Sequence, residues 1–273
     1  MTENKWVPEL TDLAYHADYQ RIGSSGMKIM FTQSPRHYKH YKDFGIEVTE
    51  AMEFGTKVHD ILFHPHLRDN IKVAPKVDRR TTVGKNEYAK FEMSIKEDSI
   101  VLSDAEAEAL LGMIKSIQEH PTAKVLFSDG IPECAGYFTD PRTGLQMKCK
   151  PDFRRHEGIL VDLKTARSAD PYDFKRQAEE LGYLIQAAFY SRGYEAIEGK
   201  PPKAFIFVAV EKTPPFYEVS CHTVTDAQME LGQHQLDMCL DKLNECALTG
   251  NWPGRWERLM DLNISDYQWE KTI

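Results

Sequence analysis

Hydrophobic residues in the first part of the chain recur every three or four positions, which is the spacing of one helix face. This spacing predicts four helices, at 24–31, from 34–35 onward, at 50–63 and at 103–119. Ser24 or Ser25 is the expected N-cap of the first helix, and Ser103-Asp-Ala-Glu106 is a capping box at the start of the last. Residues 1–22 follow no such spacing, so we expect an irregular N-terminal segment.

The middle of the chain changes to an alternation of apolar and polar positions, which is typical of strands. It predicts a meander of three strands, at 133–139, 145–153 and 159–164. The pattern then predicts a long helix, two strands and a final helix, at 173–198, 204–210, 217–224 and 225–248. This order of elements predicts an α/β (mixed α+β) fold, in which helices flank a central mixed sheet.

Nothing in the sequence divides the chain into separate units, because it contains no repeat and no Gly/Ser-rich linker. We expect one domain over 1–273, with a lead-in at 1–22, a body at 23–255 and a tail at 256–273. No run approaches the roughly 20 apolar residues of a membrane span, and the N-terminus lacks the apolar core of a signal peptide. A cytoplasmic location without a membrane partner is therefore expected.

Charge and cysteine content narrow the classes of function. Lys and Arg number 34 against 42 Asp and Glu, which gives a formal net charge of −8. Proteins that simply coat nucleic acid are usually basic, so the charge argues against that class. It leaves room for an enzyme that holds DNA in a local basic channel. The five cysteines form no CxxC pair, which argues against a zinc site and a disulfide framework.

Two aspartates and a lysine are expected on one face of the hairpin made by the second and third strands of the meander. With a loop at 154–158, Asp152 lies opposite Leu160 and diagonal to Asp162. Because side chains alternate between the two faces of a strand, Lys164 points the same way as both aspartates. Diagonal neighbours lie about 7–8 Å apart at the backbone, close enough for two carboxylates to share a cation.

The apolar neighbours of Asp162 mark its strand as buried, and a buried charge is costly unless it is paired or bound to metal. Hard carboxylate oxygens favour Mg²⁺ or Mn²⁺. Such an ion would polarise a phosphate, and Lys164 could orient a water molecule or offset developing charge. The alternative is an Asp–Lys ion pair inside the sheet, although desolvation makes such pairs poor stabilisers.

Pro151-Asp152 followed by Asp162-Leu163-Lys164 resembles the motif of the PD-(D/E)xK nuclease superfamily. Gly55-Thr-Lys-Val-His59 resembles the GxxxH helix motif of its RecB-type nucleases, and Gln186-Ala-Ala-Phe-Tyr190 resembles their QxxxY helix motif. Over roughly residues 22–255, the chain resembles the RecE-type exonucleases (exonuclease VIII). A more distant resemblance is to the lambda-exonuclease-like alkaline exonucleases.

The resemblance implies a restriction-endonuclease-like core whose catalytic residues are Asp152, Asp162 and Lys164. It also implies that His59 and the backbone carbonyl of Leu163 join the two aspartates as metal ligands. One or two Mg²⁺ ions, or Mn²⁺ in their place, are then expected in each active site.

Other residues are candidates for contact with the metals or with DNA. Glu133, at the start of the meander, could reach the metals directly or through water, or could be a solvated side chain. Gln186 and Tyr190 are four residues apart and share one helix face. Gln186 could hold a phosphate, and Tyr190 could contact DNA or serve as a core aromatic.

Two basic segments are further candidates for DNA binding. A loop within 72–90 carries Arg79, Arg80 and Lys85, and could grip DNA phosphates or simply be solvated. Ser25 near a helix N-terminus, together with Arg36, could form a terminal-phosphate pocket, although a plain helix cap is the simpler interpretation.

The resemblance implies a Mg²⁺-dependent, processive 5′-to-3′ exonuclease that acts on linear double-stranded DNA. Its product would be a 3′ single-stranded overhang for DNA repair and phage-type recombination, with a single-strand annealing protein of the RecT/Red-beta type as partner. It also implies a homo-oligomeric ring, with a trimer favoured over a tetramer, encoded by a bacterial phage or prophage. The alternatives are a structure-specific endonuclease or repair nuclease, and a non-catalytic scaffold that binds DNA ends.

Overall fold

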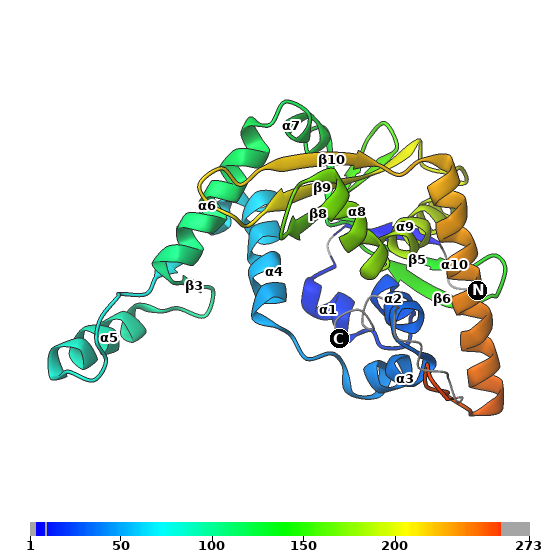
Figure 1. Ribbon diagram of the computed structural model, residues 1–273, viewed down its shortest axis with the longest axis horizontal. Helices are drawn as coiled ribbons and strands as arrows, with labels where there is room; N and C mark the ends of the chain where they lie inside the picture. Colours follow the sequence, from blue (N-terminus) through cyan, green and yellow to red (C-terminus); the bar gives the residue numbers. More distant parts are fainter. Residues whose placement is uncertain (1–3, 9, 258–273) are drawn as a thin grey trace, which may run out of the picture.

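A five-stranded sheet lies at the centre of the computed structural model, which describes residues 4–8 and 10–257 (Figure 1). In order across the sheet, its strands are β10 (Val219–Thr223), β9 (Ala204–Glu211), β8 (Ile159–Ala166), β7 (Phe153–Arg155) and β4 (Gly130–Pro132). β8 and β9 run parallel, whereas the other neighbours are antiparallel. The predicted fold class, a mixed sheet flanked by helices, is confirmed.

Helices cover both faces of this sheet, because β8 and β9 are apolar on both sides and must be buried on both. The helices packed against the first face are α2 (Ser24–Thr32), α9 (Tyr183–Glu198) and α10 (Asp226–Thr249). The helices packed against the second face are α4 (Glu50–Phe63) and α6 (Asp104–Glu119). Along β8, Leu160 belongs to the first core, and Val161 and Leu163 belong to the second.

Smaller elements complete the fold. β1 (Lys5–Val7), β5 (Ala135–Thr139) and β6 (Gln146–Cys149) form a second, antiparallel sheet. β2 (Ile71–Val73) and β3 (Ile100–Leu102) pair in parallel. Between them in the chain comes α5 (Thr82–Ser94), at the end of an arm that projects from the rest of the molecule in Figure 1. The remaining elements are α1 (Asp12–Ala17), α3 (Pro35–Phe44), the 3-10 helix η1 (Pro65–Asn70), α7 (Ala123–Leu126) and α8 (Pro171–Glu180).

The predicted three-stranded meander is wrong, because its strands are divided between the two sheets. The first begins two residues later than predicted, as β5, and Glu133, with a φ of 46°, lies between it and β4, a strand of the other sheet that was not predicted. The second gives β6 and β7, with Pro151 between them, where a missing N–H ends the ladder. Glu133 therefore stands between two strands instead of starting one.

The helix predictions were mostly confirmed, with three corrections. The predicted helix at 173–198 is two helices, α8 and α9, because Gly182 adopts a left-handed φ of 66° between them. Gly23, not a serine, is the N-cap of α2. The predicted loop within 72–90 contains the first turns of α5. The helices at 50–63, 103–119 and 225–248 are found as predicted, and the capping box of α6 is present.

The N-terminal segment is more regular than predicted, because β1 and α1 both fall within residues 1–22. At the other end, the predicted tail at 256–273 lies outside the described residues from 258 onward. Within residues 4–8 and 10–257, no helix combines the length and the apolar character that crossing a membrane requires.

Candidate active site

β8 presents two charged side chains from the middle of the sheet. Leu160 is buried in the first core, so Asp162 and Lys164, two and four residues later, lie on that same face. Asp162 is completely buried, and its Oδ2 lies 2.5 Å from Lys164 Nζ. Two charges from one strand therefore form an ion pair at the face that α9 covers.

Asp152 reaches this pair through a register that differs from the predicted one. β7 pairs Phe153 with Val161, so the residue before β7 comes opposite Asp162 and not opposite Leu160. The predicted diagonal is wrong by two residues, but a shift of two keeps every side chain on its expected face. Asp152 Oδ2 also accepts a hydrogen bond from the Leu163 N–H at 2.7 Å.

The electrostatics of the site reflect burial and close charges. Burial, followed by the charge of Asp162, raises the pKa of Asp152 to about 6. Burial alone would lower the pKa of Lys164, but the charges of Asp162 and Asp152 outweigh it and raise the value. The two carboxylates therefore destabilise each other and stabilise the ammonium group between them.

Gln186, in the first turns of α9, links both charges of β8. Its Nε2 donates a hydrogen bond to Asp162 Oδ1 at 2.7 Å, and its Oε1 accepts one from Lys164 Nζ at 3.1 Å. A second lysine, Lys28 of α2, donates to the same Oε1, also at 3.1 Å. The amide therefore fixes Asp162 and two lysines at once. Its predicted contact with a phosphate remains a prediction.

His59 approaches the aspartates from α4, on the other side of the site. Its Nδ1 lies 3.5 Å from Asp152 Oδ2. Four residues earlier, a Cβ on Gly55 would lie only 3.3 Å from Thr165 Oγ1 of β8. The glycine of the GxxxH segment therefore lets α4 approach β8 closely enough for His59 to reach Asp152.

The donor set fits a hard divalent cation. Asp152 lies opposite Asp162 in the sheet and 3.5 Å from His59, and the buried Asp162 Oδ2 is held by its ion pair with Lys164. The Leu163 carbonyl points to the same side of β8 as its N–H, because both groups of a strand residue face the same neighbour. It therefore also faces Asp152. Carboxylate and carbonyl oxygens with one imidazole are suitable ligands for Mg²⁺ or Mn²⁺.

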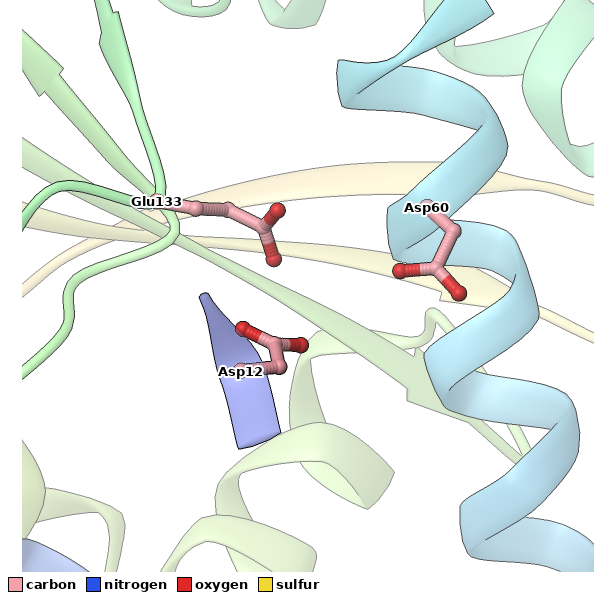
Figure 2. A group of neighbouring side chains, drawn as sticks. All are labelled: Asp12, Asp60 and Glu133. Atoms are coloured by element: carbon pink, nitrogen blue, oxygen red, sulfur yellow. The ribbon is translucent and has the colours of Figure 1, made fainter. Parts of the chain in front are cut away.

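Glu133 belongs to a separate acidic cluster with Asp12 and Asp60, whose candidate ligand atoms lie within 4.8 Å of one another. Figure 2 shows the three side chains, which come from separate segments. Glu133 Oε2 lies 2.8 Å from His64 Nε2, and its Oε1 lies 3.5 Å from Lys150 Nζ, which also pairs with Asp12. Lys150 therefore offsets part of the charge of this cluster, while burial, followed by the charges of Glu133 and Asp12, raises the pKa of Asp60. Glu133 approaches Asp152 through its backbone N–H, at 2.9 Å from the carbonyl oxygen.

A cavity of about 470 Å³ lies next to the site. Tyr190 and Ser24 connect the two, because Ser24 Oγ donates to the Tyr190 hydroxyl at 3.4 Å. The Tyr190 ring itself is buried in the first core. The lining includes Ser25, four cations (Arg21, Lys42, Lys148 and Lys150) and one carboxylate, Asp18, which pairs with Arg21. Basic and hydroxyl groups of this kind suit an anionic ligand.

The other predicted DNA contacts lie outside this cavity. Arg36 is exposed and pairs with Glu257 at 2.7 Å, so Ser25 and Arg36 do not share one pocket in the structure. Arg79, Arg80 and Lys85 lie on the arm, and Arg79 stacks over the Tyr88 ring at 3.9 Å.

Sequence reasoning missed Lys28 and the lysines of the cavity, because none of them belongs to a recognised motif. The spacing of Ser24 and Lys28 offers a signal, since residues four apart share one helix face. Lys150 directly precedes the Pro151-Asp152 motif and could have been noticed as a basic neighbour of the site.

A model of the family described as a PDDEXK-like domain of unknown function (DUF3799) matches residues 23–260 of the chain. The chain belongs to this family. The match spans most of the sequence and includes both aspartates and Lys164. The resemblance to PD-(D/E)xK nucleases predicted from short motifs is therefore confirmed.

Solved structures agree with the fold of this PDDEXK-like protein. It is similar to a candidate exonuclease from Eubacterium rectale, with 16% identity, a TM-score of 0.64 and coverage of 97% of this chain and 99% of that one. An alkaline exonuclease from Laribacter hongkongensis shows 13% identity, a TM-score of 0.37 and coverage of 86% and 93%. The fold assignment rests on the first of these. No match is found among curated proteins. Family and fold together support assignment as a nuclease, a phosphodiester hydrolase.

Proposed function

We propose that this protein is a Mg²⁺-dependent exonuclease that degrades one strand of linear double-stranded DNA processively from its 5′ end. The observation that carries the proposal is the arrangement at the middle of β8. Asp162 pairs there with Lys164 and Gln186, while Asp152 lies opposite Asp162 and 3.5 Å from His59. Buried carboxylates that destabilise each other are costly for folding, so their arrangement favours a role in binding a cation.

The reaction is hydrolysis of a phosphodiester. A water oxygen forms a bond to phosphorus, the bond from phosphorus to the 3′ oxygen breaks, and a proton ends on that 3′ oxygen. A divalent cation held by Asp152, Asp162, His59 and the Leu163 carbonyl would polarise the phosphate and offset the charge of the departing oxygen.

The chain's own residues orient these groups. Gln186 donates a hydrogen bond to Asp162 Oδ1, and Lys164 pairs with the other oxygen, Oδ2, so both oxygens of the carboxylate are fixed. Lys164 is held by Asp162 and Gln186, so its ammonium group has a fixed position from which it can donate to a water molecule or a phosphate oxygen. The buried setting makes these interactions stronger than they would be in water.

The cavity supports an end-dependent reaction. Ser24 and Ser25 form the first turn of α2, where backbone N–H groups favour anions, and Lys148 and Lys150 add positive charge. We propose that the cavity receives the phosphorylated 5′ end of the strand, so that the next phosphate comes to the aspartates.

Assembly and partnership belong to the same proposal. We propose a homo-oligomeric ring around DNA, with a trimer favoured, and a single-strand annealing protein as partner for the 3′ overhang. The resemblance to RecE-type and lambda-type exonucleases supports this part. The net charge of −8 supports it as well, because an acidic exterior would repel DNA from all but a basic interior.

Digestion of linear duplex labelled at the 5′ or the 3′ end, beside a closed circular duplex, tests the proposal. We expect Mg²⁺-dependent release of 5′-terminal nucleotides from the linear DNA, no cleavage of the circle, and full inhibition by EDTA. Cutting of the circle would instead identify a structure-specific endonuclease. Binding of DNA ends without any turnover would identify a non-catalytic scaffold.

A further inference from the structure

Lys28 reaches the same amide oxygen as Lys164. Each Nζ lies 3.1 Å from Gln186 Oε1, so the two ammonium groups are separated by no more than twice that distance. The other end of the amide is bound to Asp162. A helix outside the PD-(D/E)xK motif therefore places a second cation beside the buried aspartate.

Lys28 lacks the counter-charge that Lys164 has. Lys164 pairs with Asp162 at 2.5 Å, whereas Lys28 has no carboxylate within 4.0 Å among the residues that the structure describes. Burial, followed by the charge of Lys164, lowers the pKa of Lys28 to about 8. A half-buried cation beside a like charge is costly, and an anion brought between the two lysines would offset that cost.

We propose that Lys28 is a second catalytic cation, which contacts a non-bridging oxygen of the scissile phosphate while Gln186 holds it at a fixed separation from Lys164. This inference rests on the proposed nuclease function and adds a residue to it. Negative charge on the phosphate oxygens must be balanced in the transition state, and a pre-positioned ammonium group does so without reorganisation.

Substitution Lys28→Met tests the proposal, because it removes the charge and keeps an unbranched side chain of similar size. On 5′-phosphorylated linear duplex with Mg²⁺, we expect kcat to fall about 10- to 100-fold with little change in KM. Lys28→Arg should retain a larger share of the activity. The matched control is Lys115→Met, at an exposed position on α6 that pairs with Glu119, and its kcat should equal that of the wild type.

A substrate with a methylphosphonate at the first linkage separates contact with phosphate from a structural role, because one charged oxygen is replaced by methyl. With the two methylphosphonate diastereomers tested separately, wild type and Lys28→Met should cut the one whose methyl replaces the Lys28-facing oxygen at the same low rate, since the contact is absent in both. In EDTA, Lys28→Met should melt no lower than the wild type, because it loses a half-buried charge that has no carboxylate partner among the described residues.

Three results would overturn the inference: normal kcat in Lys28→Met, an undiminished defect on the methylphosphonate, or a lower melting temperature that explains the loss. In each case cleavage by the wild type would leave the proposed function standing. A wild-type protein that cuts no DNA would overturn the proposed function, and this inference with it.

Discussion

At the scale of residues, the site is built from charges that folding alone would not favour. Asp152 and Asp162 are brought together in a buried setting, and Asp162 is held by Lys164 and Gln186. Without a metal, the repulsion between the two carboxylates lowers the stability of the folded protein. Substitutions at these residues should therefore change stability and activity in different ways.

Asp162→Asn should reduce cleavage at least about 100-fold while the protein remains folded. The amide keeps the shape of the carboxylate but loses the charge that would hold a cation and that pairs with Lys164. Cleavage rates and circular dichroism spectra check this together. Wild-type cleavage by the folded variant would remove Asp162 from the catalytic set.

Asp152→Asn should stabilise the metal-free protein at pH 8. The folded state raises the pKa of Asp152 from 3.8 to about 6, so the folded state binds its proton more tightly than the unfolded state. Its contribution to stability is therefore lost as pH rises from about 4 through 6, by up to about 3 kcal/mol.

Urea unfolding in EDTA measures this effect. The variant should exceed the wild type in free energy of unfolding by about 1–3 kcal/mol at pH 8, and the difference should shrink as pH falls toward 4. A variant less stable than the wild type at pH 8 would show that Asp152 is net stabilising.

At the scale of elements, close helix approaches hold the site in place. A Cβ on Gly232 of α10 would lie 2.5 Å from the backbone oxygen of Leu184 in α9, two residues before Gln186. The position of Gln186 therefore depends on contact between two helices.

Gly232→Ala should lower the free energy of unfolding by about 1–3 kcal/mol, because backbone atoms must separate to admit the methyl group. It should also lower kcat, since α9 carries Gln186. Glu230→Ala, at an exposed position of the same helix, is the control and should change neither quantity. A fully stable, fully active Gly232→Ala would contradict the packing described for α9 and α10.

The arm carries the predicted DNA contacts Arg79, Arg80 and Lys85, and their positive charge can be tested separately. Changing Arg79, Arg80 and Lys85 together to alanine should weaken DNA binding. It should also reduce the slope of log binding constant against log salt concentration, by an amount that corresponds to up to about three released counterions. Changing Lys124, Lys175 and Arg176 to alanine removes the same charge from exposed positions elsewhere and should have a smaller effect. Equal losses of DNA affinity in both variants would show that the net charge of the protein, and not the position of the arm, determines DNA binding.

Helix boundaries were more predictable from the sequence than sheet topology was. The capping box at Ser103 and the apolar spacing of 50–63 are local signals, and both predictions were confirmed. The assignment of β4 and β5 to different sheets depends on long-range pairing, which alternation within one strand cannot reveal. That Asp152 and Asp162 share one face of the sheet was predictable, because a shift of the strand register by two residues leaves every side chain on the same face.

At the scale of the whole molecule, the sheet brings the charged middle of β8 against α9, and residues of α9 and α4 (Tyr190, Met52 and Thr56) line the cavity. Lys28 was not predictable, because its relation to the site exists only once α2 packs against α9. The proposed order of chemistry along a DNA end likewise depends on the cavity and the aspartates being neighbours, linked by Tyr190 and Ser24.

The proposed ring is a property of this scale too. Sedimentation equilibrium of the purified chain should give a closed oligomer, with three copies favoured over four, at micromolar concentration. A monomer at that concentration would contradict the proposed ring but would leave the proposed active site unaffected.

The most direct test of the central claim is metal-dependent cleavage of linear duplex DNA by the wild type and by Asp162→Asn in parallel. The account predicts that the wild type releases nucleotides with Mg²⁺ and none with EDTA, and that the folded variant releases almost none under either condition. Equal cleavage by both proteins, or cleavage that persists in EDTA, would contradict a nuclease site at Asp152, Asp162 and Lys164.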